Sequence, residues 1–148
     1  MARRPARRQQ AQDMPPALEV CVHGQPVSAQ TGNRRALQAW KDRVRAACEA
    51  AWTSGQPPIE GSVTIRVTHY FEIRIGDVDN LMKPIQDALQ GVAYMNDKQV
   101  TDVIGNRRDI EGSFRVRYIS ERLAAAFTDG RPFVQIRVWQ SPKREELG

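Results

Sequence analysis

Several carboxylates and one lysine are concentrated where a predicted strand gives way to a predicted helix. Asp77 and Asp79 come first, Lys83 and Asp87 follow at four-residue intervals, and Asp97 lies ten residues further on. Carboxylates held close together repel one another, and a hard divalent cation bound by oxygen ligands is the usual counter-charge. The segment therefore predicts a metal site that could polarise a bound substrate and activate water.

Magnesium suits this set of donors, because it prefers oxygen ligands and keeps several waters while using a few carboxylates. We expect Asp77 and Asp79, at the end of a strand, to meet Asp97 from the following loop and to bind Mg²⁺, with Mn²⁺ as a plausible substitute. Lys83 could stabilise charge on the reacting phosphate or position the attacking water. These four residues are the predicted catalytic group.

Simpler roles remain open for three of the polar residues. Asp79 could cap the helix, since Asp is a preferred N-cap residue. Asp87 could form only an i,i+4 salt bridge with Lys83, or it could support the metal site. Asn80 could hold a carboxylate or the loop by hydrogen bonding, or simply begin the helix.

Two other metal or phosphate motifs are excluded. A calcium EF-hand loop beginning at Asp77 would need an oxygen ligand at Leu81 and a glycine at Met82. The chain also lacks a glycine-rich loop followed by Lys-Ser or Lys-Thr, which argues against a nucleotide hydrolase.

The segment resembles the RusA-type crossover junction endodeoxyribonucleases, which resolve four-way (Holliday) DNA junctions. The shared pattern is Asp-x-Asp-Asn-x-x-Lys-x-x-x-Asp-x-Leu, followed by an acidic pair before x-Gln-Val. In this chain it is formed by Asp77, Asp79, Asn80, Lys83, Asp87 and Leu89, then by Asn96-Asp97-Lys98-Gln99-Val100. The acidic pair has become Asn96-Asp97, and its second member is the one that the family uses for metal. Residues 120–132 look like extra material.

The resemblance implies a Mg²⁺-dependent, structure-selective endodeoxyribonuclease that resolves four-way junctions by paired symmetric cuts in recombination and repair. It implies metal and catalytic roles for Asp77, Asp79, Lys83 and Asp97. Paired cuts need two active sites, so we expect a two-fold symmetric homodimer. Two alternatives remain: a nuclease for other branched DNA, such as flaps or forks, and a non-catalytic protein that binds DNA junctions.

Composition places limits on the class of protein. With 148 residues, 41% of them hydrophobic, the chain fits one domain with a substantial core. No apolar run approaches the roughly 20 residues of a membrane span, and no apolar segment follows the basic N-terminus as in a secretory signal. Cys21 and Cys48 lack metal-ligand or disulfide-framework spacing, so we expect them to be reduced. These features predict a cytoplasmic protein without a membrane partner.

The net charge of +5 is concentrated in the first residues, where four arginines occur without an acid. We expect residues 1–16 to be a flexible basic arm, residues 17–140 the nuclease domain and residues 141–148 a tail. Such an arm could bind phosphate backbones without sequence preference, or it could be a solvated tail. Other candidate DNA-binding residues are Arg34, Arg35, Arg74, Arg107 and Arg108.

Hydrophobic periodicity predicts an α+β fold: a single domain in which two main helices pack on a mixed sheet. His69 falls on the apolar face of a long alternating strand, and we expect it to be packed in the core. Pro84 suggests that regular helix begins only near Lys83. The predicted strands are 18–22, 63–75, 100–104, 114–119 and 133–139, and the predicted helices are 37–52, 83–91 and a short one at 120–127.

Overall fold

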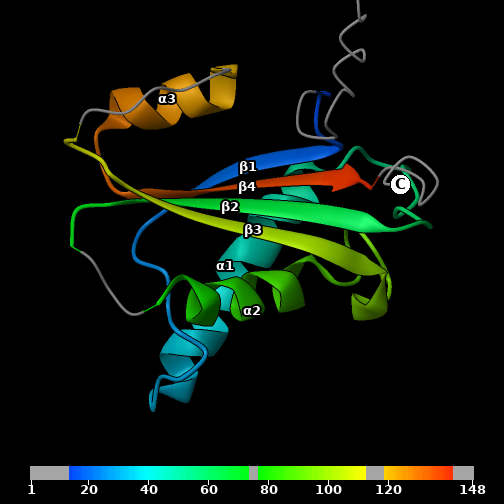
Figure 1. The fold of residues 1–148 in the computed structure, drawn as a ribbon, viewed down its shortest axis with the longest axis horizontal. Coiled ribbons are helices and arrows are strands. Elements are labelled where there is room, and N and C mark those ends of the chain that lie inside the picture. Colours follow the sequence, from blue (N-terminus) through cyan, green and yellow to red (C-terminus); the bar gives the residue numbers. More distant parts are fainter. Residues whose placement is uncertain (1–13, 74–76, 113–118, 142–148) are drawn as a thin grey trace, which may run out of the picture.

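The computed structural model describes residues 14–73, 77–112 and 119–141, which form four strands, three α-helices and one short 3₁₀ helix (Figure 1). The strands form one mixed sheet in the order β1-β4-β2-β3, in which β2 and β3 are parallel and the other pairs are antiparallel. The elements are β1 (Leu18–His23), α1 (Arg34–Ala51), β2 (Val63–Phe71), α2 (Val78–Leu89), η2 (Asp97–Gln99), β3 (Val100–Asp109), α3 (Glu121–Asp129) and β4 (Phe133–Gln140).

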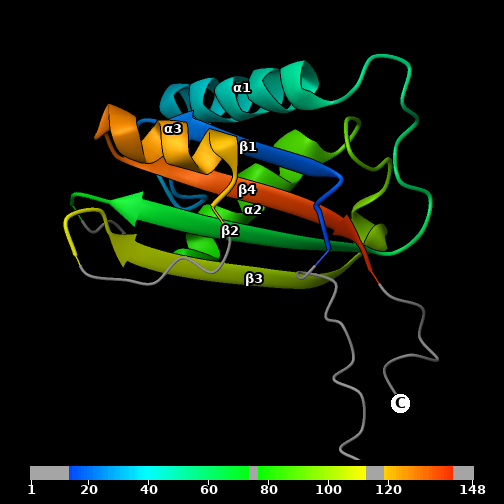
Figure 2. The same cartoon turned by 90° about the horizontal axis from the view of Figure 1, so that it is seen from above.

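The helices cover the two faces of the sheet unequally. Helices α1 and α2 lie on one face, and α3 lies on the other (Figures 1 and 2). Alternation along β2 sends Ile65 and Val67 into the larger core beneath α1 and α2, whereas Tyr70 packs with Phe127 and Phe133 on the α3 side. The predicted α+β fold, with two main helices on a mixed sheet, is confirmed.

His69 is buried on the same face as the larger core, as predicted. Burial, with a smaller contribution from the charge of Arg107, lowers the pKa of His69 to about 4. The two cysteines are free thiols, and burial is the largest cause that raises the pKa of each to about 12. None of the described helices is long and apolar enough to cross a bilayer.

Helix α2 begins five residues earlier than the sequence suggests, so the predicted start near Lys83 is wrong. Pro84 lies inside the helix and cannot donate the hydrogen bond that the Asn80 carbonyl would normally accept. The backbone N–H of Ala29 donates to that carbonyl at 2.9 Å instead. A loop far away in sequence therefore satisfies the group that proline leaves unpaired, and the helix continues through Pro84.

Other boundaries differ more modestly. Strand β2 ends at Phe71 rather than at residue 75, and β3 extends to Asp109, beyond the predicted end at residue 104. The predicted strand at 114–119 lies almost entirely outside the described residues. The basic arm and the C-terminal tail lie largely outside them as well, so the predicted domain boundaries stay predictions.

Helix α2 approaches the edge strand β3 closely at Gly105. A Cβ atom on Gly105 would clash with Cγ1 of Val78 and would lie 3.4 Å from the sulfur of Met82. Val78 and Met82 come from the first turns of α2, just after Asp77. The missing side chain at Gly105 thus allows the start of α2 to rest against the sheet.

Replacing Gly105 with alanine should push α2 away from β3 and destabilise the fold by about 1–3 kcal/mol, as overpacking commonly does. Denaturant unfolding followed by circular dichroism measures this change. Gly32→Ala is the matched control, because a Cβ there meets nothing within 4 Å. Equal stability of the two variants would show that α2 does not depend on the close contact.

Candidate active site at the N-terminal end of helix α2

Two exposed carboxylates occupy the N-terminal end of α2. Asp77 is the N-cap residue, with φ −92° and ψ 148°, yet its side chain makes no capping hydrogen bond. Asp79 lies in the first turn, so capping does not account for it either. Both acids lie at the positive end of the helix dipole, which favours negative charge there. Neither forms an ion pair within the described residues, so their oxygens are available to a cation.

Lys83 and Asp87 form the i,i+4 salt bridge that their spacing allows. The Lys83 Nζ lies 3.1 Å from Asp87 Oδ1, and Lys41 from α1 lies 3.5 Å from the other oxygen of the same carboxylate. Both oxygens of Asp87 therefore face ammonium groups. This arrangement accounts for Asp87 without a metal and holds Lys83 on the outer face of α2.

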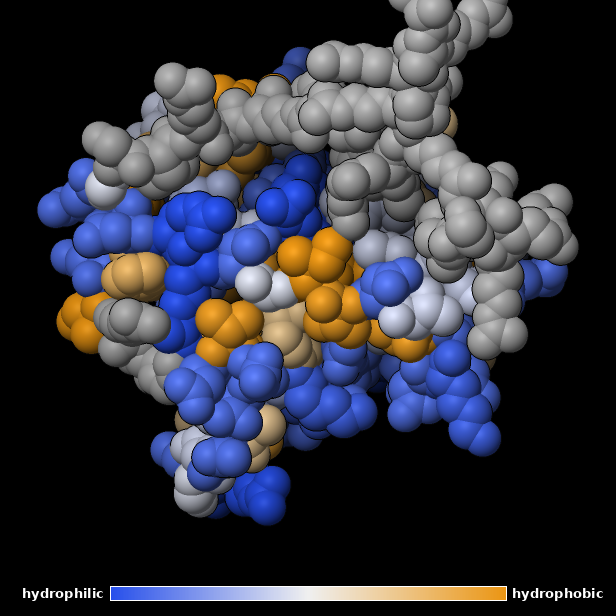
Figure 3. Space-filling view, viewed as in Figure 1, coloured by the Kyte–Doolittle hydropathy of each residue, from blue (hydrophilic) through white to orange (hydrophobic). Residues whose placement is uncertain are grey.

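An open cavity of about 370 Å³ lies between α2 and β3 (Figure 3). Asp79, Lys83 and Gln86 contribute its polar groups on the α2 side, while Met82 and Val103 form apolar walls. In Figure 3, hydrophobic side chains occupy the middle of this face and hydrophilic ones surround them. The complete lining is Val78, Asp79, Met82, Lys83, Gln86, Val103 and Gly105.

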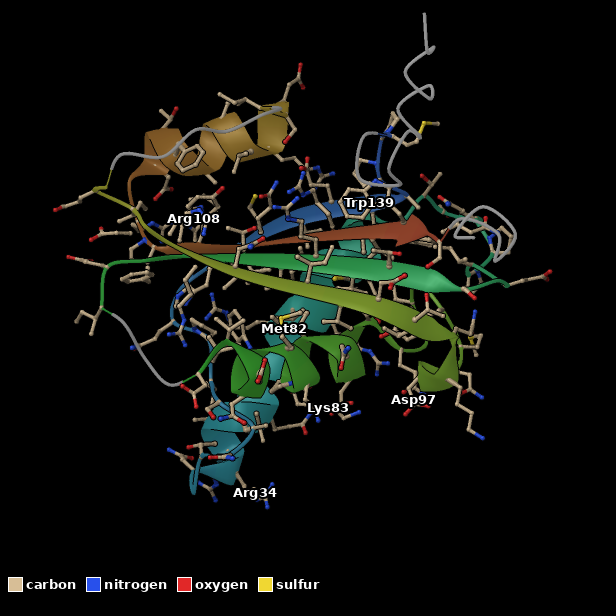
Figure 4. The ribbon with its side chains drawn as sticks, in the orientation of Figure 1. Arg34, Met82, Lys83, Asp97, Arg108 and Trp139 are labelled. Carbon is tan, nitrogen blue, oxygen red and sulfur yellow. The ribbon has the colours of Figure 1, made fainter. Side chains whose placement is uncertain are left out.

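Asp97 does not join the other two aspartates within one chain. It begins η2, which follows the C-terminal end of α2, and Figure 4 shows it beyond that end of the helix. A helix of this length spans about 18 Å, and Asp77 lies at its opposite end. Within the described part of the chain, no three His, Cys, Asp or Glu side chains form a metal-binding group.

The donors at the start of α2 nevertheless fit a magnesium ion. Magnesium is commonly bound through one or two carboxylates together with waters and substrate phosphates. Asp77 and Asp79 are two such carboxylates, both exposed beside an open groove. Asp87 does not fit this role, because its two oxygens face lysines.

Asn80 contributes its backbone to the same corner of the fold. Its N–H donates to the carbonyl of Asp77 at 3.1 Å, and its own carbonyl accepts from Ala29. Among the described residues, its side chain makes no hydrogen bond to Asp77 or Asp79. Asn80 therefore ties the helix start to a neighbouring loop, which favours the interpretation that it begins the helix.

The arginines proposed from sequence are dispersed. Arg34 and Arg35 are exposed at the start of α1. Figure 4 shows Arg34 away from Met82 and Lys83, which line the cavity. Arg107 and Arg108 are neighbours on β3, so their side chains leave opposite faces of the sheet. Arg74 lies outside the described residues.

Sequence patterns missed the residues that shape the cavity. Val103 and Gly105 belong to a strand whose alternation is weak, and Met82 and Gln86 lie within an ordinary helical pattern. A glycine inside a strand does signal close approach of another backbone or helix. That one signal was present in the sequence at Gly105.

Comparison with known proteins identifies the family of the chain. No curated protein matches the chain. The chain does match the family described as Endodeoxyribonuclease RusA over residues 19–138, which include every described strand and helix except the ends of β1 and β4. The candidate residues at the start of α2, together with Asp97, fall within that match. With most of its length matched, and with an α+β fold consistent with this family, the chain belongs to the RusA family of endodeoxyribonucleases.

Proposed function

We propose that this protein is a Mg²⁺-dependent, structure-selective endonuclease that resolves four-way DNA junctions by paired symmetric cuts. The observation that carries the proposal is the groove between α2 and β3. There Asp79 and Lys83 line one open cavity, next to Asp77, in a chain that belongs to a family of endodeoxyribonucleases. Recombination and repair are the processes that such an activity would serve.

The side chains divide the chemistry between them. When bound, Mg²⁺ would polarise the phosphate and lower the pKa of a bound water. Asp77 and Asp79 would hold the ion where the phosphate enters the groove. Lys83, oriented by Asp87, would place its ammonium group against the charge that develops on the phosphate oxygens. Met82 and Val103 form apolar walls beside these charged groups.

In this proposal, Asp97 contributes to the active site of the other protomer in a homodimer. It lies at one end of α2, and the Asp77–Asp79 pair lies at the other. A two-fold axis that passes beside the middle of α2, perpendicular to the helix, would place two such helices antiparallel. The pair from one protomer would then face Asp97 of the partner subunit. Two equivalent sites would result, as paired cuts require.

Two alternatives use the same surface differently. A nuclease for flaps or forks would keep the metal site but prefer another branched substrate. A non-catalytic junction-binding protein would leave two exposed carboxylates beside the DNA without a cation, and like charges repel. The carboxylates that face no lysine favour a nuclease over the binding protein. Cleavage of synthetic four-way junctions, forks, flaps and linear duplexes side by side separates the two nucleases.

Replacing Asp79 with asparagine should lower the rate of junction cleavage at least about 100-fold while leaving the fold intact, because a neutral amide binds Mg²⁺ poorly. The measurement is cleavage of a labelled four-way junction with Mg²⁺, with Mn²⁺ and with EDTA. Asp42→Asn, on the exposed side of α1, is the control for lost charge. Undiminished metal-dependent cleavage by Asp79→Asn would show that this corner is not the active site.

Replacing Asp87 with asparagine should have a smaller effect, because Asp87 orients Lys83 rather than binding metal. We expect a rate reduction of about 10-fold or less and a stability loss of about 0–1 kcal/mol, typical of exposed ion pairs. The dependence of the rate on Mg²⁺ concentration should stay unchanged. A large increase in the Mg²⁺ concentration needed for half-maximal rate would instead make Asp87 a metal ligand.

Mixed dimers test whether Asp97 acts across the subunit interface. Asp79→Asn and Asp97→Asn chains should each be inactive alone, and co-expressed heterodimers with two different tags should regain one intact site. Such heterodimers should nick one strand of a junction instead of making paired cuts. Heterodimers without any nicking activity would show that each site takes its aspartates from a single chain.

A further inference from the structure

Two arginines face each other directly on the sheet face opposite α2. Arg66 of β2 and Arg137 of β4 are register partners in the antiparallel pair. They point away from the core beneath α1 and α2, because their neighbours Ile65, Val67 and Ile136 occupy it. Like charges directly opposite on neighbouring strands destabilise a sheet. The stability of the sheet therefore does not explain why two arginines face each other here.

The described residues supply little counter-charge to this pair. Arg66 donates from Nε to the neutral side chain of Asn106 at 2.9 Å. The buried Nε of Arg137 has no hydrogen-bond partner, and its guanidinium lies 5.4 Å from the Trp139 ring centroid. Neither arginine forms an ion pair with a described carboxylate.

The acidic residue beside Arg137 on β1 has a hydrogen-bond partner of its own. Glu19 is the register partner of Arg137 on β1, but its Oε2 accepts a hydrogen bond from Gln135 at 3.0 Å. By contrast, Arg131, two residues after the end of α3, forms a two-bond pair with Asp129. The exposed Arg131 therefore has a carboxylate partner close by. Arg66 and Arg137 face each other without such a partner among the described residues.

A third cation lies next to the pair. Arg108 of β3 is exposed and is the register partner of Tyr70, on the same face as Arg66. Arg66 contacts Asn106, which lies two residues before Arg108 on the same face of β3. Burial, then the charges of Arg137 and Arg108, lower the pKa of Arg66. The cluster formed by Arg66, Arg108 and Arg137 is here called the arginine cluster.

The arginine cluster lies just across β3 from the candidate active site. Gly105 contacts the start of α2 on one face of β3, and Arg108 follows three residues later on the other face, about 10 Å along the strand. Figure 4 shows Arg108 and Lys83 on opposite sides of this strand. No described strand pairs with the outer edge of β3, so DNA could approach both faces from that edge.

We propose that the arginine cluster binds backbone phosphates of a second arm of the branched DNA while the α2 groove binds the strand to be cut. Guanidinium groups suit phosphate oxygens because they donate two parallel hydrogen bonds. This inference rests on the proposed function, since only a branched substrate offers a second arm at that position. The repulsion within the cluster is then relieved when DNA binds.

Junction binding measured in EDTA, where no cutting occurs, tests the proposal. Arg66→Gln, Arg108→Gln and Arg137→Gln should each weaken binding to a four-way junction by about 5- to 20-fold near 100 mM salt. Each should also reduce the slope of log affinity against log salt by about one unit. Binding to a linear duplex should weaken less. Arg108→Lys should keep the salt slope, which separates charge from packing.

Arg131→Gln is the matched control, because it removes the same charge from an arginine that Asp129 already neutralises. Thermal unfolding of the free variants adds a second readout. Relief of repulsion predicts that Arg108→Gln is no less stable than the natural chain, whereas a purely structural cluster predicts a loss.

Three results would overturn the inference. If all three cluster variants bind and cleave the junction as the natural chain does, the arginine cluster does not bind DNA. The proposed function would be unaffected by that result. An equal loss of binding by Arg131→Gln would show a general effect of net charge. Absence of binding to both junction and duplex at low salt would overturn the inference and the proposed function together.

Discussion

Helix α2 lies against β3 because Leu81, Ile85 and Leu89 are buried under the sheet and Gly105 presents no side chain to the helix. This contact fixes the end of the helix that carries the acids. It also opens the groove in which Asp79 and Lys83 face the same solvent-filled space. A displacement of α2 would move the acids and the lysine together, so stability and chemistry depend on one packing contact.

Charges in this fold are balanced in some places and left exposed in others. Asp87 forms ion pairs with two lysines, which holds Lys83 in a defined position. The acids at the start of α2 and the arginine cluster across β3 lack such partners within the described residues. Charged side chains without ion-pair partners are expected where a ligand of opposite charge binds. A cation suits the first location, and a phosphate backbone suits the second.

The length of α2 determines how far apart the aspartates of one protomer lie in the proposed dimer. A helix about 18 Å long separates Asp97 from the other aspartates. In the proposed dimer, the same distance becomes useful, because antiparallel helices bring unlike ends together. A symmetric substrate and a symmetric enzyme would then share one axis.

The local sequence alone determined which residues could do chemistry. The spacing of these residues predicted acids where a strand gives way to a helix and an i,i+4 pair of Lys83 and Asp87, because helical periodicity depends only on neighbouring residues. Periodicity likewise predicted most strands and the packed His69. Only the tertiary structure decided where α2 begins, since the Ala29 N–H that satisfies the Asn80 carbonyl comes from a distant loop. It also decided that Asp97 lies apart and that Arg66 faces Arg137, because strand register and helix direction join residues far apart in the chain.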